Sequence, residues 1–285
     1  REWDRELLER LGYPGKLFEA LAMPGTEVGR LTKEIEQEVG YSCQVVLPAT
    51  HDTGSAVLAV PSLKEDTLYI SSGTWSLLGV EQEEPICTEE SRQANFTNEG
   101  GYAYRYRYLK NIMGLWMIQS VRRELPEHYA FSELCDLARE NQAFPSRVDV
   151  NAAAFLAPES MIEAIQLECA RTMQPVPRTP GELAAVIYQS LAESYAKAIK
   201  ELERLTGIPY DEIHIVGGGS NAEYLNELTA EKSGLRVLAG PAEATAIGNL
   251  AAQMIAAGVF ADYREARACI LQSCEVKSYS HTSIA

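Results

Sequence analysis

The residues best suited to chemistry are His51, Asp52 and Thr53, which follow the short apolar run from Gln44 to Leu47. They open a run of small residues, Thr53 to Val60, that predicts a closely packed helix. An aspartate between a strand and a helix points its carboxylate away from the backbone ladder, beside the unpaired N–H groups of the first helical turn. This position suits a general base. A helix N-cap, in which Asp52 accepts from an N–H group two or three residues on, is the commoner use, so the context must decide.

Two turns have the composition of phosphate-binding loops. Ile213 to Val216 predicts a strand, and the triple glycine Gly217 to Gly219 follows it ahead of a predicted helix, Ala222 to Ser233. Glycines there let backbone N–H groups approach an anion, and the helix N-terminus adds partial positive charge. The second turn, Ser72-Gly73-Thr74, presents hydroxyl and N–H groups at the tip of a predicted hairpin. Each turn alone is more simply an ordinary tight turn.

The three motifs are more informative together than singly. Transfer of a phosphoryl group to an alcohol needs a group that accepts the proton, and a bound nucleotide needs contacts to its phosphates. An aspartate at a strand end, a Ser/Gly/Thr hairpin and a strand-glycine-helix turn in one chain supply both.

The first elements around these motifs are antiparallel strands. Thr67 to Ser72 and Trp75 to Val80 predict the hairpin. Tyr102 to Tyr108 alternates tyrosine with arginine, which predicts a third strand with one buried aromatic face and one solvated cationic face. Asn111 to Leu125 has apolar residues in helical phase. Two further predicted helices complete an insertion: Phe131 to Ala143 and Ser160 to Met173.

From residue 180 onward, helices alternate strictly with strands. The predicted elements are the helix Gly181 to Thr206, the strand Ile213 to Val216, the helix Ala222 to Ser233, the strand Leu235 to Leu238 and the helix Glu243 to Ala257. Such alternation is typical of parallel winding. Three strands followed by these units give the order βββαβαβα, so the predicted fold class is α/β with a ribonuclease H-like sheet.

The composition excludes several classes of protein. The chain has 285 residues, 46% of them apolar, which is enough for one large or two ordinary domains. A net charge of -15 argues against nucleic-acid binding, which needs a basic face. No apolar run approaches the roughly 20 residues that span a bilayer, and no signal-peptide pattern is present, so no membrane partner is predicted. Six scattered cysteines without a C-x-x-C pair indicate reduced thiols and a cytoplasmic location.

Five blocks of the sequence resemble, in order and spacing, the C-terminal part of the FGGY family of carbohydrate kinases. They are Ala49 to Thr53, Ser71 to Ser76, Thr97 to Gly101, Leu109 to Trp116 and Ile213 to Gly219. The resemblance extends over essentially the whole chain. The first and last blocks are similar to sugar kinases in general, whereas Asn98 to Gly101 and Leu109 to Trp116 resemble the members that act on L-rhamnulose.

This resemblance implies an actin-like ATPase fold and ATP-dependent phosphorylation of L-rhamnulose at its primary hydroxyl, with Mg²⁺, giving L-rhamnulose 1-phosphate. By the resemblance, Asp52 is the catalytic base that also contacts the substrate. The other implied sugar contacts are His51, Thr53 and Asn111. The implied nucleotide contacts are Thr74, Gln119, Gly217, Gly218 and Gly219. None of these residues is assigned as a metal ligand.

The resemblance also divides the chain into two parts. Residues 1–66 would be the closing segment of a sugar-binding N-terminal domain, and residues 67–285 the nucleotide-binding domain. The sequence starts at Arg1 without the family's first phosphate loop, so we expect a piece of a longer protein that is inactive alone. Two alternatives remain. Another FGGY kinase, for fuculose or xylulose, is disfavoured by Asn98 to Gly101, and a non-catalytic ATP-binding module of the actin or Hsp70 type has no use for Asp52.

Overall fold

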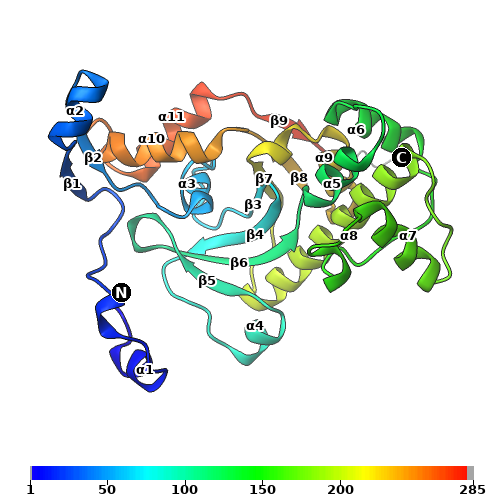
Figure 1. Ribbon diagram of the computed structural model, residues 1–285, viewed down its shortest axis with the longest axis horizontal. Helices are drawn as coiled ribbons and strands as arrows, with labels where there is room; N and C mark the ends of the chain where they lie inside the picture. The colour runs from blue at the N-terminus through cyan, green and yellow to red at the C-terminus, as the bar shows by residue number, and fades with distance from the viewer. Residues whose placement is uncertain (1, 281–285) are drawn as a thin grey trace.

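Seven strands form one sheet at the centre of the protein, in a computed structural model that describes residues 2–280 (Figure 1). Their order across the sheet is β5-β6-β4-β3-β7-β8-β9. The β3–β7 and β7–β8 pairs are parallel and the others antiparallel. The strands are β3 (Tyr69–Ser72), β4 (Trp75–Gln82), β5 (Thr97–Gly100), β6 (Tyr106–Met113), β7 (Glu212–Val216), β8 (Arg236–Ala239) and β9 (Lys277–Tyr279).

Helices cover both faces of this sheet (Figure 1). One face packs against α5 (Trp116–Glu124), α6 (Phe131–Glu140), α7 (Met161–Arg171), α8 (Pro180–Thr206) and α9 (Glu223–Ser233). The other packs against α3 (Asp52–Leu58), α10 (Ala244–Ala256) and α11 (Tyr263–Ser273). A short helix, α4 (Glu89–Gln93), lies between β4 and β5.

Alternating side chains of the strands separate two hydrophobic cores. In β3, Ile70 belongs to the core under α5–α9, and its neighbour Tyr69 belongs to the core under α3, α10 and α11. In the second core, α10 lies so close to α3 that a Cβ on Gly248 would overlap the Ser55 carbonyl. The small residues of α3 therefore serve the close packing that the sequence predicted.

The predicted order of elements is present, with additional strands. β5, β9 and α11 were not predicted, and β5 and β9 lie at the two edges of the sheet. The predicted helix from Asn111 is wrong at its start, because Asn111 to Met113 continue β6 in register with Leu77 to Trp75 of β4. The helix α5 begins only at Trp116.

The predicted strand from Tyr102 is also corrected. Residues 102–104 form a 3-10 turn in which Ala103 and Tyr104 have positive φ angles of 54° and 61°, and the strand begins at Tyr106. The predicted solvated cationic face is wrong too, since Arg105 and Arg107 are buried. Both can be buried because carboxylates and carbonyl groups pair with them.

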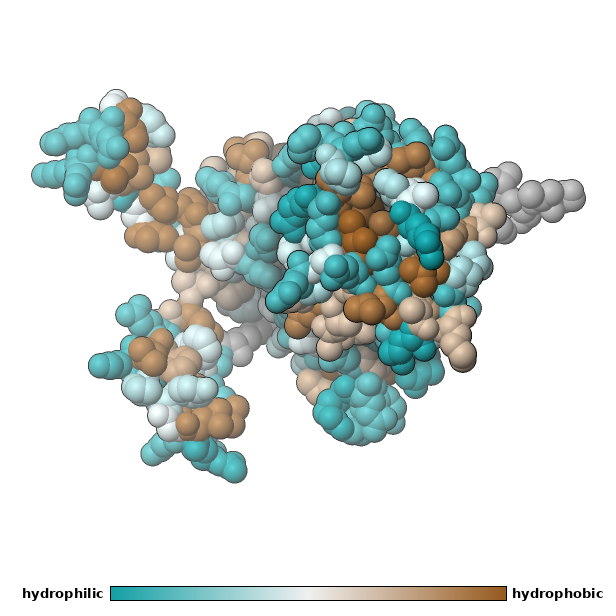
Figure 2. Space-filling model, turned by 45° about the vertical axis from the view of Figure 1, so that its right-hand side comes forward, coloured by the Kyte–Doolittle hydropathy of each residue, from teal (hydrophilic) through white to brown (hydrophobic). Residues whose placement is uncertain are grey.

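An N-terminal segment, residues 2–48, stands apart from this α/β body. It contains α1 (Arg5–Arg10), β1 (Glu27–Arg30), α2 (Lys33–Val39) and β2 (Gln44–Val46), and β1, which was not predicted, pairs antiparallel with β2. In Figure 2 two small lobes stand clear of the main body and carry apolar side chains on their surfaces. The exposed large apolar residues of the segment are Trp3, Leu7, Leu11, Tyr13, Leu17, Leu21, Val28, Ile35, Val39, Tyr41 and Val45.

The helix α3 links this segment to the body and packs with the body. Ala56 to Val60 are buried in the core formed with α10 and α11. The limits given above for the two domains, at residues 66 and 67, stay a prediction.

Candidate active site

One cavity of about 630 Å³ brings the three predicted motifs together. It is lined by His51, Asp52, Thr53, Ser71, Ser72, Gly73, Thr74, Trp75, Leu77, Glu99, Asn111, Gly217, Gly218, Ala242, Glu243 and Thr245. Seven of the nine predicted site residues are among them. The other two are not: Gln119 lies half-buried on α5, and Gly219 is buried behind the turn.

Asp52 is the first residue of α3, and its side chain is 78% exposed at the cavity. The cap position before it is occupied by His51, which makes no side-chain cap bond. The carboxylate Oδ1 accepts from the N–H of the adjacent Thr53 at 2.7 Å, rather than from a group two or three residues on. The N-cap interpretation is therefore wrong, and the carboxylate is free to face a ligand.

The β3–β4 turn is held from behind by the start of α5. The Leu115 N–H donates to the Gly73 carbonyl at 2.9 Å, and the Trp116 N–H donates to the Thr74 carbonyl at 3.2 Å. These carbonyl groups are therefore engaged behind the turn, and Thr74 itself lines the cavity. Below the turn, burial raises the pKa of Tyr195 to about 12, while its hydroxyl shares a 2.6 Å bond with Ser76.

The three glycines after β7 have different surroundings. Gly217 has a φ of 85°, and a Cβ there would lie 2.7 Å from the Ser72 carbonyl oxygen. A Cβ on Gly219 would overlap the Ser72 hydroxyl. A Cβ on Gly218 would meet nothing within 4 Å. Gly217 and Gly219 thus allow β7 to turn against the end of β3, and Gly218 faces the open cavity.

Several cavity residues were missed by sequence reasoning. Glu99 stands on β5, which the sequence did not reveal as a strand, although it belongs to one of the blocks that carry the family resemblance. Glu243 and Thr245 stand at the start of α10, and the Thr245 hydroxyl donates to the Asp52 carbonyl at 3.4 Å. They follow β8 as the glycines follow β7, so the strand-to-helix position was a usable signal.

Comparison with known proteins identifies the family of this arrangement. Residues 68–257 match the model of the C-terminal domain of the FGGY family of carbohydrate kinases. The chain belongs to the FGGY family. This confirms the resemblance that the motifs indicated.

Relatives within the FGGY family match nearly all of the chain. A rhamnulokinase from Halalkalibacterium halodurans is 48% identical over 98% of this chain and 59% of its own length. A rhamnulokinase from Bacillus subtilis is 46% identical over 99% of this chain and 58% of its own length. The chain thus spans somewhat under two thirds of the relatives that it matches.

Solved structures of two small-molecule kinases share the fold. A gluconate kinase from Lactobacillus acidophilus superposes with a TM-score of 0.71 at 16% identity, covering 99% of this chain and 56% of the kinase. The ADP complex of Plasmodium falciparum glycerol kinase gives 0.66 at 11% identity, covering 96% of this chain and 55% of the kinase. The predicted fold class, an actin-like ATPase fold, is confirmed. Within residues 2–280 no helix is long and apolar enough to cross a membrane.

Proposed function

We propose that this chain carries the catalytic aspartate and the nucleotide site of an ATP-dependent kinase that converts L-rhamnulose to L-rhamnulose 1-phosphate. The observation that carries the proposal is the single cavity on which Asp52, the β3–β4 turn and the glycine turn after β7 meet. The choice of sugar is supported by relatives named rhamnulokinase that are 39–48% identical to this chain.

In this proposal Asp52 orients the primary hydroxyl of the sugar and accepts its proton as the phosphoryl group arrives. Its exposed carboxylate satisfies the first requirement for a general base, which is access to the reacting proton. His51, Thr53 and Asn111 border the same space and supply polar contacts to the sugar. The protein's contribution is chiefly positioning, as in other phosphoryl transfers.

In this proposal the nucleotide binds the part of the cavity that the two turns line. Thr74 offers a hydroxyl from the hairpin, and Gly217 and Gly218 let a phosphate approach the backbone closely. Gly219 acts indirectly, because its missing side chain lets this turn reach Ser72. Gln119 lies outside the wall of the cavity, so its contact with nucleotide requires that ATP extend beyond the cavity toward α5.

Mg²⁺ fits this site as a companion of the nucleotide. Mg²⁺ is usually held by one or two carboxylates, by waters and by substrate phosphates, rather than by a cage of protein ligands. Among residues 2–280 no cluster of three or more histidine, cysteine or carboxylate side chains could hold a metal ion. Glu243 is a cavity carboxylate that would hold the ion together with ATP, and the charge of the ion would offset that of the phosphates.

Turnover is tested on this chain joined to the part of the Halalkalibacterium halodurans relative that it does not match, which we call the completed kinase. ADP release is measured with L-rhamnulose, L-fuculose and D-xylulose. We expect kcat/KM for L-rhamnulose to be at least about tenfold higher than for the other two sugars. A preference for fuculose or xylulose would replace the sugar assignment. ATP binding without turnover of any sugar would favour a non-catalytic module.

A further inference from the structure

A buried arginine lies directly behind the residues at the start of α3. The side chain of Arg107, on β6, is 2% exposed, and its Nε and Nη2 both donate to the Gly100 carbonyl, at 3.1 and 3.0 Å. Its guanidinium lies beside the first turn of α3, where a Cβ on Gly54 would be 3.8 Å from Cζ. Burial of a cation destabilises the folded protein unless well-placed partners compensate for it, so the position of Arg107 needs an explanation.

The guanidinium of Arg107 contacts the His51 imidazole. Arg107 Nη2 lies 3.0 Å from His51 Nδ1, and the other ring nitrogen of His51, Nε2, lies 3.6 Å from Asp52 Oδ1. Glu99 completes the cluster, because its Oε2 is 3.1 Å from Arg107 Nη2 and 3.4 Å from His51 Nδ1. The charged groups around the imidazole are thus Arg107 from β6, Glu99 from β5 and Asp52 from α3.

This arrangement selects one form of the imidazole. A guanidinium N–H can only donate, so Nδ1 of His51 must accept and carries no proton. In the other neutral tautomer, the proton on Nδ1 would point at a donor 3.0 Å away. Glu99 Oε2 is the farther neighbour of Nδ1, at 3.4 Å, and no hydrogen bond joins the two atoms. The bond made by one ring nitrogen fixes the role of the other, so the proton of His51 sits on Nε2 and faces Asp52.

We propose that Arg107 is a positioning residue: held by Gly100 and Glu99, it fixes His51 in the Nε2–H tautomer, which directs the Asp52 carboxylate. The consequence for catalysis rests on the proposed role of Asp52 as base. The tautomer is independent of that role, because the contacts of His51 alone determine it. His51 Nε2 lies 3.6 Å from Oδ1, the oxygen that also accepts from the Thr53 N–H, and the proton on Nε2 attracts that oxygen.

The tautomer is measured directly by long-range ¹H–¹⁵N correlation NMR of the chain at a pH of about 9, well above the ordinary histidine pKa. The sequence has only four histidines, so the His51 signals are assigned by their loss in His51→Gln. We expect Nε2 to have the shift of a protonated ring nitrogen and Nδ1 that of an unprotonated one. A protonated Nδ1 beside an unprotonated Nε2 would overturn the proposal.

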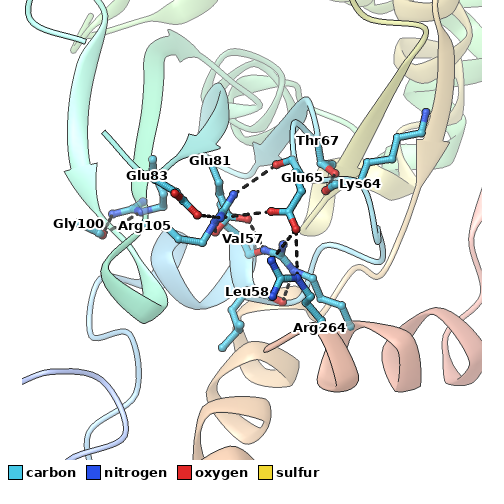
Figure 3. Close-up of polar contacts among 12 residues, drawn as sticks. Val57, Leu58, Lys64, Glu65, Thr67, Glu81, Glu83, Gly100, Arg105 and Arg264 are labelled. Carbon is cyan, nitrogen blue, oxygen red and sulfur yellow. Dashed lines mark hydrogen bonds and ion pairs between the residues drawn. The ribbon is translucent and has the colours of Figure 1, made fainter. Parts of the chain in front are cut away.

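A matched pair of variants separates positioning from stability. Arg107→Met removes the donor to His51, and we expect the His51 signals to move toward a mixture of tautomers. Arg105→Met removes a second buried arginine two residues away, whose partners are Glu65, Glu81 and Glu83 (Figure 3). It should leave the His51 signals unchanged. If both variants alter them alike, the effect is general loosening and the proposal fails.

Glu99→Gln serves if Arg107→Met does not fold. It keeps a side chain of the same size but removes the carboxylate that, among residues 2–280, lies within reach of Nδ1. We expect the Nε2–H tautomer to persist in this variant, because Arg107 dictates it. Conversion of His51 from an Nδ1–H form in the parent to an Nε2–H form in Glu99→Gln would show that Glu99, not Arg107, sets the ring.

The kinetic consequence is tested in the completed kinase. Arg107→Met should lower kcat by about tenfold to a hundredfold, the scale of a misplaced reacting group, and leave KM for ATP nearly unchanged. Arg105→Met should leave both unchanged at temperatures where it is folded. An unchanged kcat in a folded Arg107→Met protein would overturn the positioning role. Failure of Asp52→Asn to reduce turnover would instead overturn the proposed base and leave the tautomer result standing.

Discussion

The two ends of α3 have opposite character. At its start the Asp52 side chain is 78% exposed, and it borders the cavity. At its end the carbonyl groups of Val57 and Leu58 accept from the buried guanidinium of Arg267, which also pairs with Glu81. Figure 3 shows the acidic and basic side chains that gather around this second end. One short helix therefore has an exposed charge at one end and buried, paired charges at the other, its closed end.

This difference separates function from stability. A reactive carboxylate must stay accessible, so its surroundings cannot satisfy it fully. The helix that carries it still has to be fixed, and the fully paired end does this without entering the cavity. Changes at the start of α3 should therefore alter turnover and spare stability, and changes at its end should do the reverse.

The largest expected effect comes from Asp52→Asn in the completed kinase. Removal of a general base should lower kcat by about two to four orders of magnitude. Affinity for ATP and the thermal midpoint should stay nearly the same, because the exposed carboxylate bonds only its neighbour Thr53. Steady-state kinetics and calorimetry measure these quantities.

Asp136→Asn is the matched control for this experiment. Asp136 is 70% exposed and pairs with Arg139 within α6, away from the cavity. The same chemical change should leave its turnover at the parent level. If Asp52→Asn retained more than a third of the parent kcat, the start of α3 would not be a catalytic end.

The next largest effect should come from the closed end. Arg267→Met leaves the buried Glu81 carboxylate without its principal partner, a change that costs about 3–5 kcal/mol of unfolding free energy. Arg264→Met, one turn earlier on α11, removes only an exposed pair with Glu65 and should shift the urea midpoint little. Equal losses of unfolding free energy in the two variants would mean that the buried bonds from Arg267 do not stabilise the end of α3. The folded Arg267→Met protein should bind ATP with the parent affinity.

The glycines after β7 repeat the same contrast within three residues. A side chain on Gly218 has open space, so Gly218→Val should fold normally and raise the Kd for ATP by about tenfold or more. Gly219→Val would overlap Ser72 and should lower the thermal midpoint before any effect on ligand can be measured. Titration calorimetry and thermal unfolding of this chain test both. Unchanged ATP binding by a folded Gly218→Val protein would remove this turn from the nucleotide site.

The sequence predicted the local elements of this site well. The hairpin around Gly73 and the strand before Gly217 were identified because turn glycines flanked by apolar runs are local signals. The fold class followed from the order of such elements. The meeting of Asp52, Thr74 and Gly218 on one cavity could be inferred only through the family resemblance, since long-range contacts create it.

The two arginines of the Tyr/Arg run show where local reasoning failed. Alternation correctly gave Tyr108 a buried place, but it assigned Arg105 and Arg107 to solvent. Their partners come from distant segments: Glu65 precedes β3, and Glu99 lies on β5. A pattern of period two describes which face a residue occupies and says nothing of the charges that other segments bring to that face.

The smallest expected effect concerns pH and the buried His214, on β7 near the closed end of α3. Burial lowers the pKa of His214 to about 4, although Glu212, 3.7 Å away, opposes this shift. An unfolded histidine titrates near 6.5, so below that pH the unfolded chain takes up a proton that the folded chain refuses. The contribution of His214 is therefore intact above pH 6.5 and declines by at most about 1.4 kcal/mol per pH unit as the pH falls toward 4. His214→Gln should flatten the slope of urea-unfolding free energy against pH in that window, whereas His128→Gln, at an exposed site, should keep it. A parent slope that persists in His214→Gln would assign this acid sensitivity to other groups of the closed end.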